Sequence, residues 1–289
     1  MKLWLALPAL RPGQDYRDYA AAAKAAGAEG VTIAEHLIVP ETVGEYPYSG
    51  KQAVIPLGTQ FPDPLTVIAD MAAHVDDIRF MTNMLIAPLY HPLVLARQAA
   101  TVDAMSGGRL DLGVGAGWMR EEFDAIDVPF EARGARMNET IELLPQLWSG
   151  EPIKHEGKCF SFAASQTPTP PCAIPIFVGG NADVAIRRAA SMADGWSGVG
   201  LAEDDLAQML ERIAEISAEV RDPARKPLQI RTLLKGRPDA KRLASHAALG
   251  IEALVLQSWQ VTGKKPGEPE TAEEVGEKLA ELTAICSGI

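Results

Sequence analysis

The sequence predicts an eight-stranded β/α barrel of the TIM type, with insertions after strands 2 and 4. Eight short apolar segments are each followed by a segment with helical spacing of apolar residues, the alternation that builds a parallel sheet covered by helices. Glycine lies at three junctions between a helix and the next strand, Gly27, Gly195 and Gly250, as short helix-to-strand loops require. A doubly wound open sheet is the alternative, less favoured because no glycine-rich turn follows the first strand.

The predicted strands carry apolar residues on both faces, as expected for strands that are covered on two sides. In the first of them, Leu3, Leu5 and Leu7 alternate with Trp4 and Ala6. The eight predicted strands are 2–7, 30–34, 80–87, 109–114, 176–181, 195–199, 228–234 and 253–256. No linker, repeat or low-complexity tract divides them, so residues 1–289 are expected to form one barrel domain.

The helices between these strands have recognisable ends. Asp15 is a predicted N-cap of the first helix, and Gly27 follows its last turn. Asp63 and Pro64 open the second helix, with proline at the first position, where its missing N–H costs nothing. Apolar stripes predict further helices at 95–102, 123–126, 137–148, 186–190, 206–220, 243–247 and 275–285.

The two insertions differ in character. Residues 37–64 show no periodicity but many prolines, glycines and aromatic residues, which predicts an ordered loop that covers the site. In residues 151–175, Phe160 and Phe162 alternate as they do in a hairpin.

Composition excludes several classes of function. A formal net charge of −11 without any basic block argues against a nucleic-acid or anionic-membrane partner. No apolar run is long enough to span a bilayer. The cysteines (Cys159, Cys172 and Cys286) show no C-x-x-C spacing, which favours a reducing cytoplasm over a disulfide framework or a zinc site. The histidines other than His36 show no ligand-like spacing to a carboxylate, so we expect no metal.

Two glycine clusters at neighbouring strand ends are the strongest indication of a site. Strand four ends in Gly115, Ala116 and Gly117, and strand five ends in Gly179 and Gly180. Such glycines allow positive φ and close approach of the backbone, so that N–H groups can face an anion. A tight turn would use the same residues, and the spacing is not that of the dinucleotide fingerprint. Because both clusters lie at one rim of a barrel, they favour a site for a phosphate and a flat cofactor.

Polar residues at two other strand ends are further candidates. Asn83 stands in an apolar strand, where its amide either bonds the backbone or faces a polar ring in the pocket. His36 follows the second strand and is a candidate proton donor. Glu35, its neighbour, is a carboxylate of the kind that fixes a histidine tautomer. Adjacent strand residues point to opposite faces, however, so only one of the two is expected to face a ligand.

The run 106–118, followed by 121–123 and 133–136, resembles the bacterial-luciferase-like flavin and deazaflavin oxidoreductases. Other segments are similar to the mycobacterial-type subgroup assigned to coenzyme F420, namely 35–40, 46–48, 63–65, 175–180 and 194–196. The resemblance extends in order from residue 1 to about residue 260, and it implies a barrel of the bacterial-luciferase kind with the cofactor ring at its carboxyl-end mouth.

The resemblance also implies roles for individual residues. A non-prolyl cis peptide would join Asn83 to Met84 and form a bulge against the ring. His36 matches a histidine near the reactive carbon in deazaflavin-dependent sugar-phosphate dehydrogenases. The contacts to the phosphate tail would fall on Gly115, Ala116, Gly117, Trp118, Gly179, Gly180 and Asn181. Those dehydrogenases carry an acidic residue at the position of Trp118 and a tryptophan at that of Pro40, so their sugar substrate is not transferred.

The function expected from this resemblance is hydride transfer between bound coenzyme F420 and a small organic substrate, with His36 and Glu35 as catalytic candidates. A reduced-FMN monooxygenase is the nearest alternative. A non-catalytic flavin- or deazaflavin-binding protein and a Schiff-base aldolase using Lys235 are the others. Barrels of this family often pair, which makes a homodimer one expected state.

Overall fold

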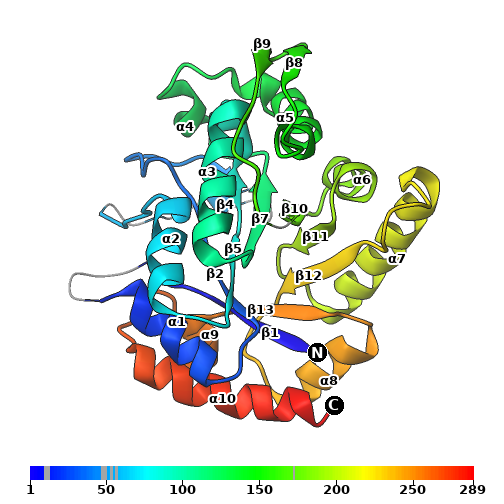
Figure 1. The fold of residues 1–289 in the computed structure, drawn as a ribbon. Helices are drawn as coiled ribbons and strands as arrows, with labels where there is room; N and C mark the ends of the chain where they lie inside the picture. Colours follow the sequence, from blue (N-terminus) through cyan, green and yellow to red (C-terminus); the bar gives the residue numbers. More distant parts are fainter. Residues whose placement is uncertain (10–13, 47–50, 53–54, 56–57, 172) are drawn as a thin grey trace.

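Eight parallel strands close into a barrel that helices surround (Figure 1). The computed structural model describes the chain except residues 10–13, 47–50, 53–54, 56–57 and 172, and only the backbone of 51 and 52, so Cys172 and residues 47 and 48 of the first insertion lie outside the described residues. The barrel strands are β1 (Lys2–Ala6), β2 (Gly30–Ile33), β5 (Arg79–Thr82), β7 (Leu110–Gly115), β10 (Ile176–Gly179), β11 (Gly195–Gly198), β12 (Gln229–Leu233) and β13 (Ala253–Gln257).

The strands follow one another around the barrel in chain order, and two pairings close the ring. The first strand pairs with the last, with Leu5 opposite Leu256. The fourth, β7, pairs with the fifth, β10, with Val114 opposite Val178. All neighbours in the ring are parallel, so the eight carboxyl ends meet at one rim, as predicted for a TIM-type barrel.

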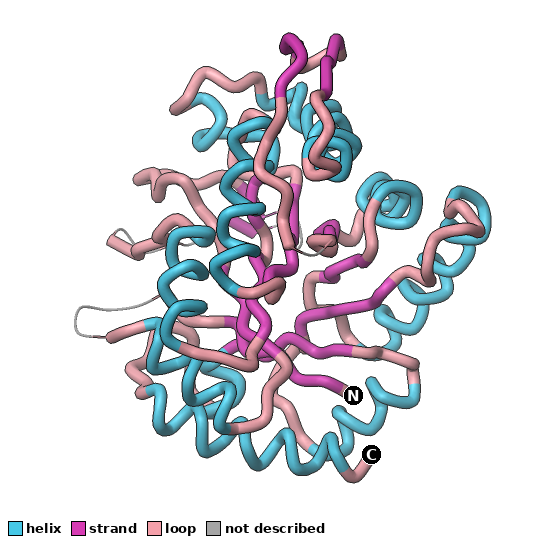
Figure 2. Tube along the Cα trace, viewed as in Figure 1, coloured by secondary structure: helices cyan, strands magenta, loops and turns pink. Residues whose placement is uncertain are grey.

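Helices form an outer layer around these strands (Figure 2). Asp15 and Asp63 cap the first two through side-chain bonds to backbone N–H groups, as their positions predicted. The helices are α1 (Tyr16–Ala25), α2 (Pro64–His74), α3 (Pro92–Ser106), α4 (Arg120–Asp124), α5 (Arg133–Leu147), α6 (Asp183–Met192), α7 (Glu203–Val220), α8 (Ala240–Ala248), α9 (Ser258–Thr262) and α10 (Ala272–Ser287), with 3-10 turns η1 (Ala87–Leu89) and η2 (Phe130–Ala132). In the part of the chain that the structure describes, no helix is both long enough and apolar enough to cross a membrane.

Both predicted insertions are present. The first contains the antiparallel strands β3 (Glu45–Tyr46) and β4 (Lys51–Gln52). The second contains the predicted hairpin, β8 (Ile153–Glu156) and β9 (Ser161–Ser165), which stands beside α5 at the top of Figure 1.

The third strand differs from the prediction of a continuous strand over 80–87. Pairing stops at Thr82 and resumes in β6 (Leu85–Ile86), and the peptide bond between Asn83 and Met84 is cis, as the resemblance implied. Apolar residues lie on both sides of the break, in Phe80 and Met81 and in Met84 to Ile86, so a pattern based on hydrophobicity alone predicts an unbroken strand.

The barrel interior is filled below the rim. Trp4, Met81 and Phe177 pack there in one cluster. Arg231 lies among them, with its guanidinium 4.2 Å from the Trp4 ring centroid and 2.7 Å from the buried carboxylate of Asp111.

Candidate functional site

The two glycine-rich strand ends lie side by side at that rim. Since Val114 pairs with Val178, the residues that follow them, Gly115 and Gly179, are neighbours on adjacent strands. Both glycines are partly exposed. The structure therefore brings the two predicted clusters together at one place on the rim.

Met84 gives these glycines a packing role. A Cβ atom on Gly179 would lie 2.6 Å from Cγ of Met84, and one on Gly115 would lie 3.1 Å from its Cβ. The Met84 side chain thus occupies the space that side chains on these two residues would need. Part of the glycine pattern is explained by this close contact.

Asn83 connects three strand ends. Its backbone N–H donates to the carbonyl of Ile33 at 2.7 Å, and its Oδ1 accepts from the Ser197 hydroxyl at 3.2 Å. Among the described residues, its Nδ2 has no acceptor, and the residue is partly exposed. The amide N–H₂ group is available to a ligand at the rim.

The segment after strand four turns at a glycine that has no room for a side chain. Gly117 has a φ of 78°, and a Cβ there would lie 2.8 Å from Ile86 and from Phe123. The turn presents Trp118, whose ring meets that of Tyr46 edge to face with 5.3 Å between centroids. Aromatic groups therefore form one wall of the rim.

The segment after strand five offers backbone donors. Both polar groups of the Asn181 side chain bond the backbone of Val199, at 3.1 and 3.0 Å, so the side chain is already occupied. Gly180 has a φ of 118°. Among the described residues, the N–H groups of Asp183 and Val184 at the start of α6 have no acceptor. An anion at this rim would meet backbone N–H groups and not the Asn181 amide.

His36 lies at the same rim, with 15% of its side chain exposed. Its Nδ1 is 3.2 Å from Oε1 of Glu122, a fully buried residue of α4. The rings of Phe61 and Trp118 meet its ring edge to face, with centroids at 4.8 and 5.9 Å. Sequence reasoning did not find Glu122 or Phe61 as site residues. Glu121 and Glu122 are consecutive and identical, and no local pattern shows which one is buried.

Glu35 does not pair with His36, contrary to the expected carboxylate–histidine pair. Its carboxylate accepts hydrogen bonds from the Tyr90 hydroxyl and from the backbone N–H of Ile86. The two neighbours diverge. Burial raises the pKa of Glu35 above its usual value, although both hydrogen bonds oppose that shift, and burial together with Glu35 raises the pKa of Tyr90. Through these two bonds Glu35 holds the last residue of β6 and Tyr90, which follows η1, next to the end of β2.

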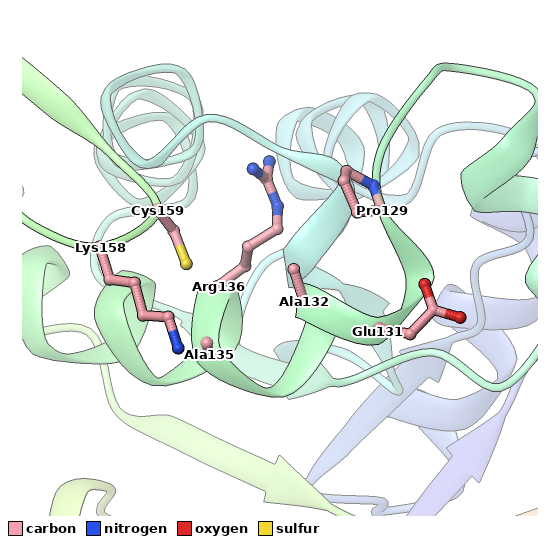
Figure 3. A pocket seen from close by; sticks show the side chains of 7 residues that line it. All are labelled: Pro129, Glu131, Ala132, Ala135, Arg136, Lys158 and Cys159. Atoms are coloured by element: carbon pink, nitrogen blue, oxygen red, sulfur yellow. The ribbon is translucent and has the colours of Figure 1, made fainter.

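A separate hollow lies between the start of α5 and the hairpin (Figure 3). Its volume is about 310 Å³, and Lys158 and Cys159 face it from the hairpin turn. Arg136, on α5, donates to the carbonyl of Pro88 at 2.8 Å and lies 4.6 Å from the Phe160 ring centroid. Its guanidinium is thus engaged in holding the hairpin and η1 together.

The rim defines a class of protein: a closed β/α barrel with paired glycine strand ends, a partly buried histidine and a non-prolyl cis peptide. The sequence model of the luciferase-like monooxygenase family matches residues 5–284, and the chain belongs to this family.

Its relatives and structural neighbours agree with that membership. An uncharacterised protein of Mycobacterium tuberculosis is 35% identical over 208 residues, which are 71% of this chain and 72% of that protein. Monooxygenase RslO1 from Streptomyces bottropensis has a TM-score of 0.75 at 19% identity, over 98% of this chain and 99% of its own. An F420-dependent secondary alcohol dehydrogenase, solved with an F420–acetone adduct, has a TM-score of 0.75 at 16% identity over 99% of both chains. At these identities the two structures share the fold alone.

Proposed function

We propose that this protein is an F420-dependent oxidoreductase that transfers a hydride between bound F420 and a small organic substrate. The observation that carries the proposal is the pairing of the two glycine strand ends at the rim where His36 lies. The F420-dependent secondary alcohol dehydrogenase, which has the same fold, supports it.

The residues at the rim fit such a cofactor. Ala6, Gly115 and Gly179 are small, and the Met84 side chain, which packs against the two glycines, would form the surface on which a flat ring lies. The free N–H groups of Asp183 and Val184 at the start of α6 suit a phosphate, because a helix N-terminus favours negative charge. When bound, F420 supplies a carbon centre that carries hydride.

Residues of the chain itself would position the cofactor ring and supply a proton to the substrate. The Asn83 amide is placed to donate to a polar edge of a ring, and Met84 supports it from below. Trp118 and Phe61 shield the rim from water. His36 is the proposed group that donates a proton to, or polarises, the substrate oxygen.

A reduced-FMN monooxygenase is the second candidate. The family description and the shared fold with monooxygenase RslO1 favour it. The same backbone donors suit the phosphate of FMN, so the two candidates differ in the ring and not in the tail.

The test is a pair of titrations of the purified protein with F420 and with FMN, followed by fluorescence. We expect F420 to bind at least about tenfold more tightly, a difference of about 1.4 kcal/mol. Tighter binding of FMN would favour the monooxygenase, and binding of neither would overturn both candidates.

A matched pair of variants tests the position of the tail. Val184 on α6 and Met105 near the end of α3 are both exposed apolar residues. Val184→Glu adds a negative charge beside the free N–H groups and should weaken F420 binding about tenfold. Met105→Glu adds the same charge at the opposite end of the barrel and should leave the affinity unchanged. Equal effects would exclude a phosphate site at α6.

A further inference from the structure

Glu122 is an unusual carboxylate because it is completely buried and only half partnered. Its side chain has 0% exposure. Oε1 accepts the backbone N–H of Leu37 at 2.6 Å and lies 3.2 Å from Nδ1 of His36. Among the described residues, Oε2 has no hydrogen-bond partner. A buried polar atom without a partner costs about 1–3 kcal/mol, so stability alone does not explain this glutamate.

The hydrogen-bonding chemistry of this contact determines where the histidine proton lies. Oε1 already acts as an acceptor toward the Leu37 N–H. A carboxylate oxygen in that role meets a ring nitrogen favourably only if the nitrogen carries a hydrogen. Nδ1 of His36 is therefore the donor, and Nε2 is the nitrogen of the neutral ring that holds the lone pair.

We infer that Glu122 is a positioning residue that holds His36 in its Nδ1–H tautomer, with Nε2 free to exchange a proton at the rim. This inference rests on the proposed function only for the use of that proton. The tautomer itself is a property of the protein without any ligand.

The packing around the pair keeps this arrangement rigid. The rings of Phe61 and Trp118 lie nearly perpendicular to the His36 ring and in contact with it, which restricts its rotation. Phe123, next to Glu122, packs against the Phe130 ring at 5.2 Å and against Gly117. Glu122 is thus anchored from the α4 side and His36 from the rim side.

The experiment uses the full chain labelled with ¹⁵N-histidine, at a pH of about 8.5, where an ordinary histidine with a pKa of about 6.5 is neutral. The chain has five histidines, and the spectrum of His36→Gln identifies the signals of His36. Nitrogen shifts separate protonated from unprotonated ring nitrogens. We expect Nδ1 of His36 to carry the proton in the wild-type protein. A wild-type spectrum in which Nε2 carries it instead would by itself overturn the inference.

Three substitutions on α4 separate positioning from packing. Glu122→Gln keeps an acceptor oxygen for Nδ1–H and should retain the tautomer. Glu122→Leu removes the acceptor at similar volume and should shift His36 toward the Nε2–H tautomer. Glu121→Gln changes the neighbouring, partly exposed glutamate and should leave the spectrum unchanged. A wild-type tautomer in Glu122→Leu would overturn the inference.

Turnover adds a second measurement. In Glu122→Leu we expect kcat to fall about tenfold to a hundredfold with KM nearly unchanged, and Glu122→Gln should recover most of it. An equal loss in both variants would contradict a tautomer role. If F420 fails to bind while Glu122→Leu still changes the tautomer, the proposed function fails and the role of Glu122 stands.

Discussion

Two histidine–glutamate pairs in this molecule use the same chemical groups in different surroundings. At the barrel rim, Nδ1 of His36 lies 3.2 Å from Oε1 of Glu122. In the second insertion, Nε2 of His155 lies 2.7 Å from Oε1 of Glu139, which belongs to α5. Each glutamate also accepts hydrogen bonds from the backbone of a segment distant in sequence, from Leu37 in the case of Glu122 and from Cys159 and Phe160 in the case of Glu139, so both hold a loop in place.

The difference lies in how fully each carboxylate is used. Glu139 accepts the N–H groups of Cys159 and Phe160, both at 2.9 Å, so both of its oxygens are partnered. Glu122 leaves Oε2 without a partner among the described residues and is more deeply buried. The burial of Glu139, whose two oxygens are both hydrogen-bonded, is explained by the loop that it holds in place. A buried carboxylate with one unpartnered oxygen beside a histidine at the rim is not explained in this way, which supports the positioning role proposed for Glu122.

The largest expected effect separates the two histidines by activity. His36→Gln should lower turnover about a hundredfold, because general acid–base groups contribute about 10²–10⁴ in rate. His155→Gln should change turnover by no more than about twofold, since the pair of His155 and Glu139, here called the hairpin pair, lies outside the rim. The measurement is F420-linked turnover across a panel of small alcohols and aldehydes. Similar losses in both variants would show that the two pairs do not differ in function.

The barrel could be predicted because its signals are local. Apolar strands, N-cap residues and glycines after helices each act within a few positions. The structure confirms the caps at Asp15 and Asp63 and the positive-φ turns at Gly27 and Gly250, whereas Gly195 is already the first residue of β11. The adjacency of Gly115 and Gly179 followed from strand order alone. The short helix α9 was missed because its five residues carry too little periodicity to detect.

The partners of the side chains could not be predicted, because they depend on packing between distant segments. Glu122 and His36 are 86 positions apart, and Glu139 and His155 are 16 apart. Strand alternation predicted that only one of Glu35 and His36 faces a ligand, but both lie beyond the end of β2, and no pattern showed which carboxylate reaches the histidine. The strand-end rule placed Met84 at this rim, but its close contact with the two glycines was not predicted.

The second effect concerns the stability that each glutamate provides. Glu139→Ala should lower the free energy of unfolding by about 2 kcal/mol, because the N–H of buried Phe160 loses its acceptor. Glu122→Leu should cost less, because it also removes an unpartnered buried oxygen. Urea unfolding measures both, with Glu142→Ala on the exposed face of α5 as the control. A greater loss in Glu122→Leu would reverse the assignment of the two glutamates.

The third effect is the pH dependence of the hairpin pair. Burial of Glu139 opposes its ionisation, but the hydrogen bonds from His155, Cys159 and Phe160 outweigh it and hold its pKa below the ordinary 4.5. Since the folded pKa lies below the unfolded one, the ionised group stabilises the fold above about pH 4.5, and this contribution disappears as the pH falls through the folded pKa.

Unfolding of the wild-type protein and of Glu139→Gln between neutral and acidic pH measures this contribution. The wild-type protein should be more stable near pH 7, and the difference should shrink on acidification. The loss of stability in Glu139→Gln near pH 7 should be smaller than the loss in Glu139→Ala, because glutamine keeps an acceptor oxygen. Parallel curves would mean that the charge of Glu139 adds nothing to its hydrogen bonds.

The smallest effect compares the histidine rings as hydrogen-bond donors. His155→Phe keeps a ring beside Phe162, at present 5.6 Å away, but removes one of the three donors to Glu139 and should cost about 1 kcal/mol. His36→Phe should cost less than about 0.5 kcal/mol, because the Leu37 N–H still satisfies Oε1 of Glu122. The midpoints of urea unfolding, compared between variants with equal m-values, measure both losses of stability. If His36→Phe proved the more destabilising, the rim pair would serve stability, and its carboxylate with one unpartnered oxygen would no longer support the positioning role.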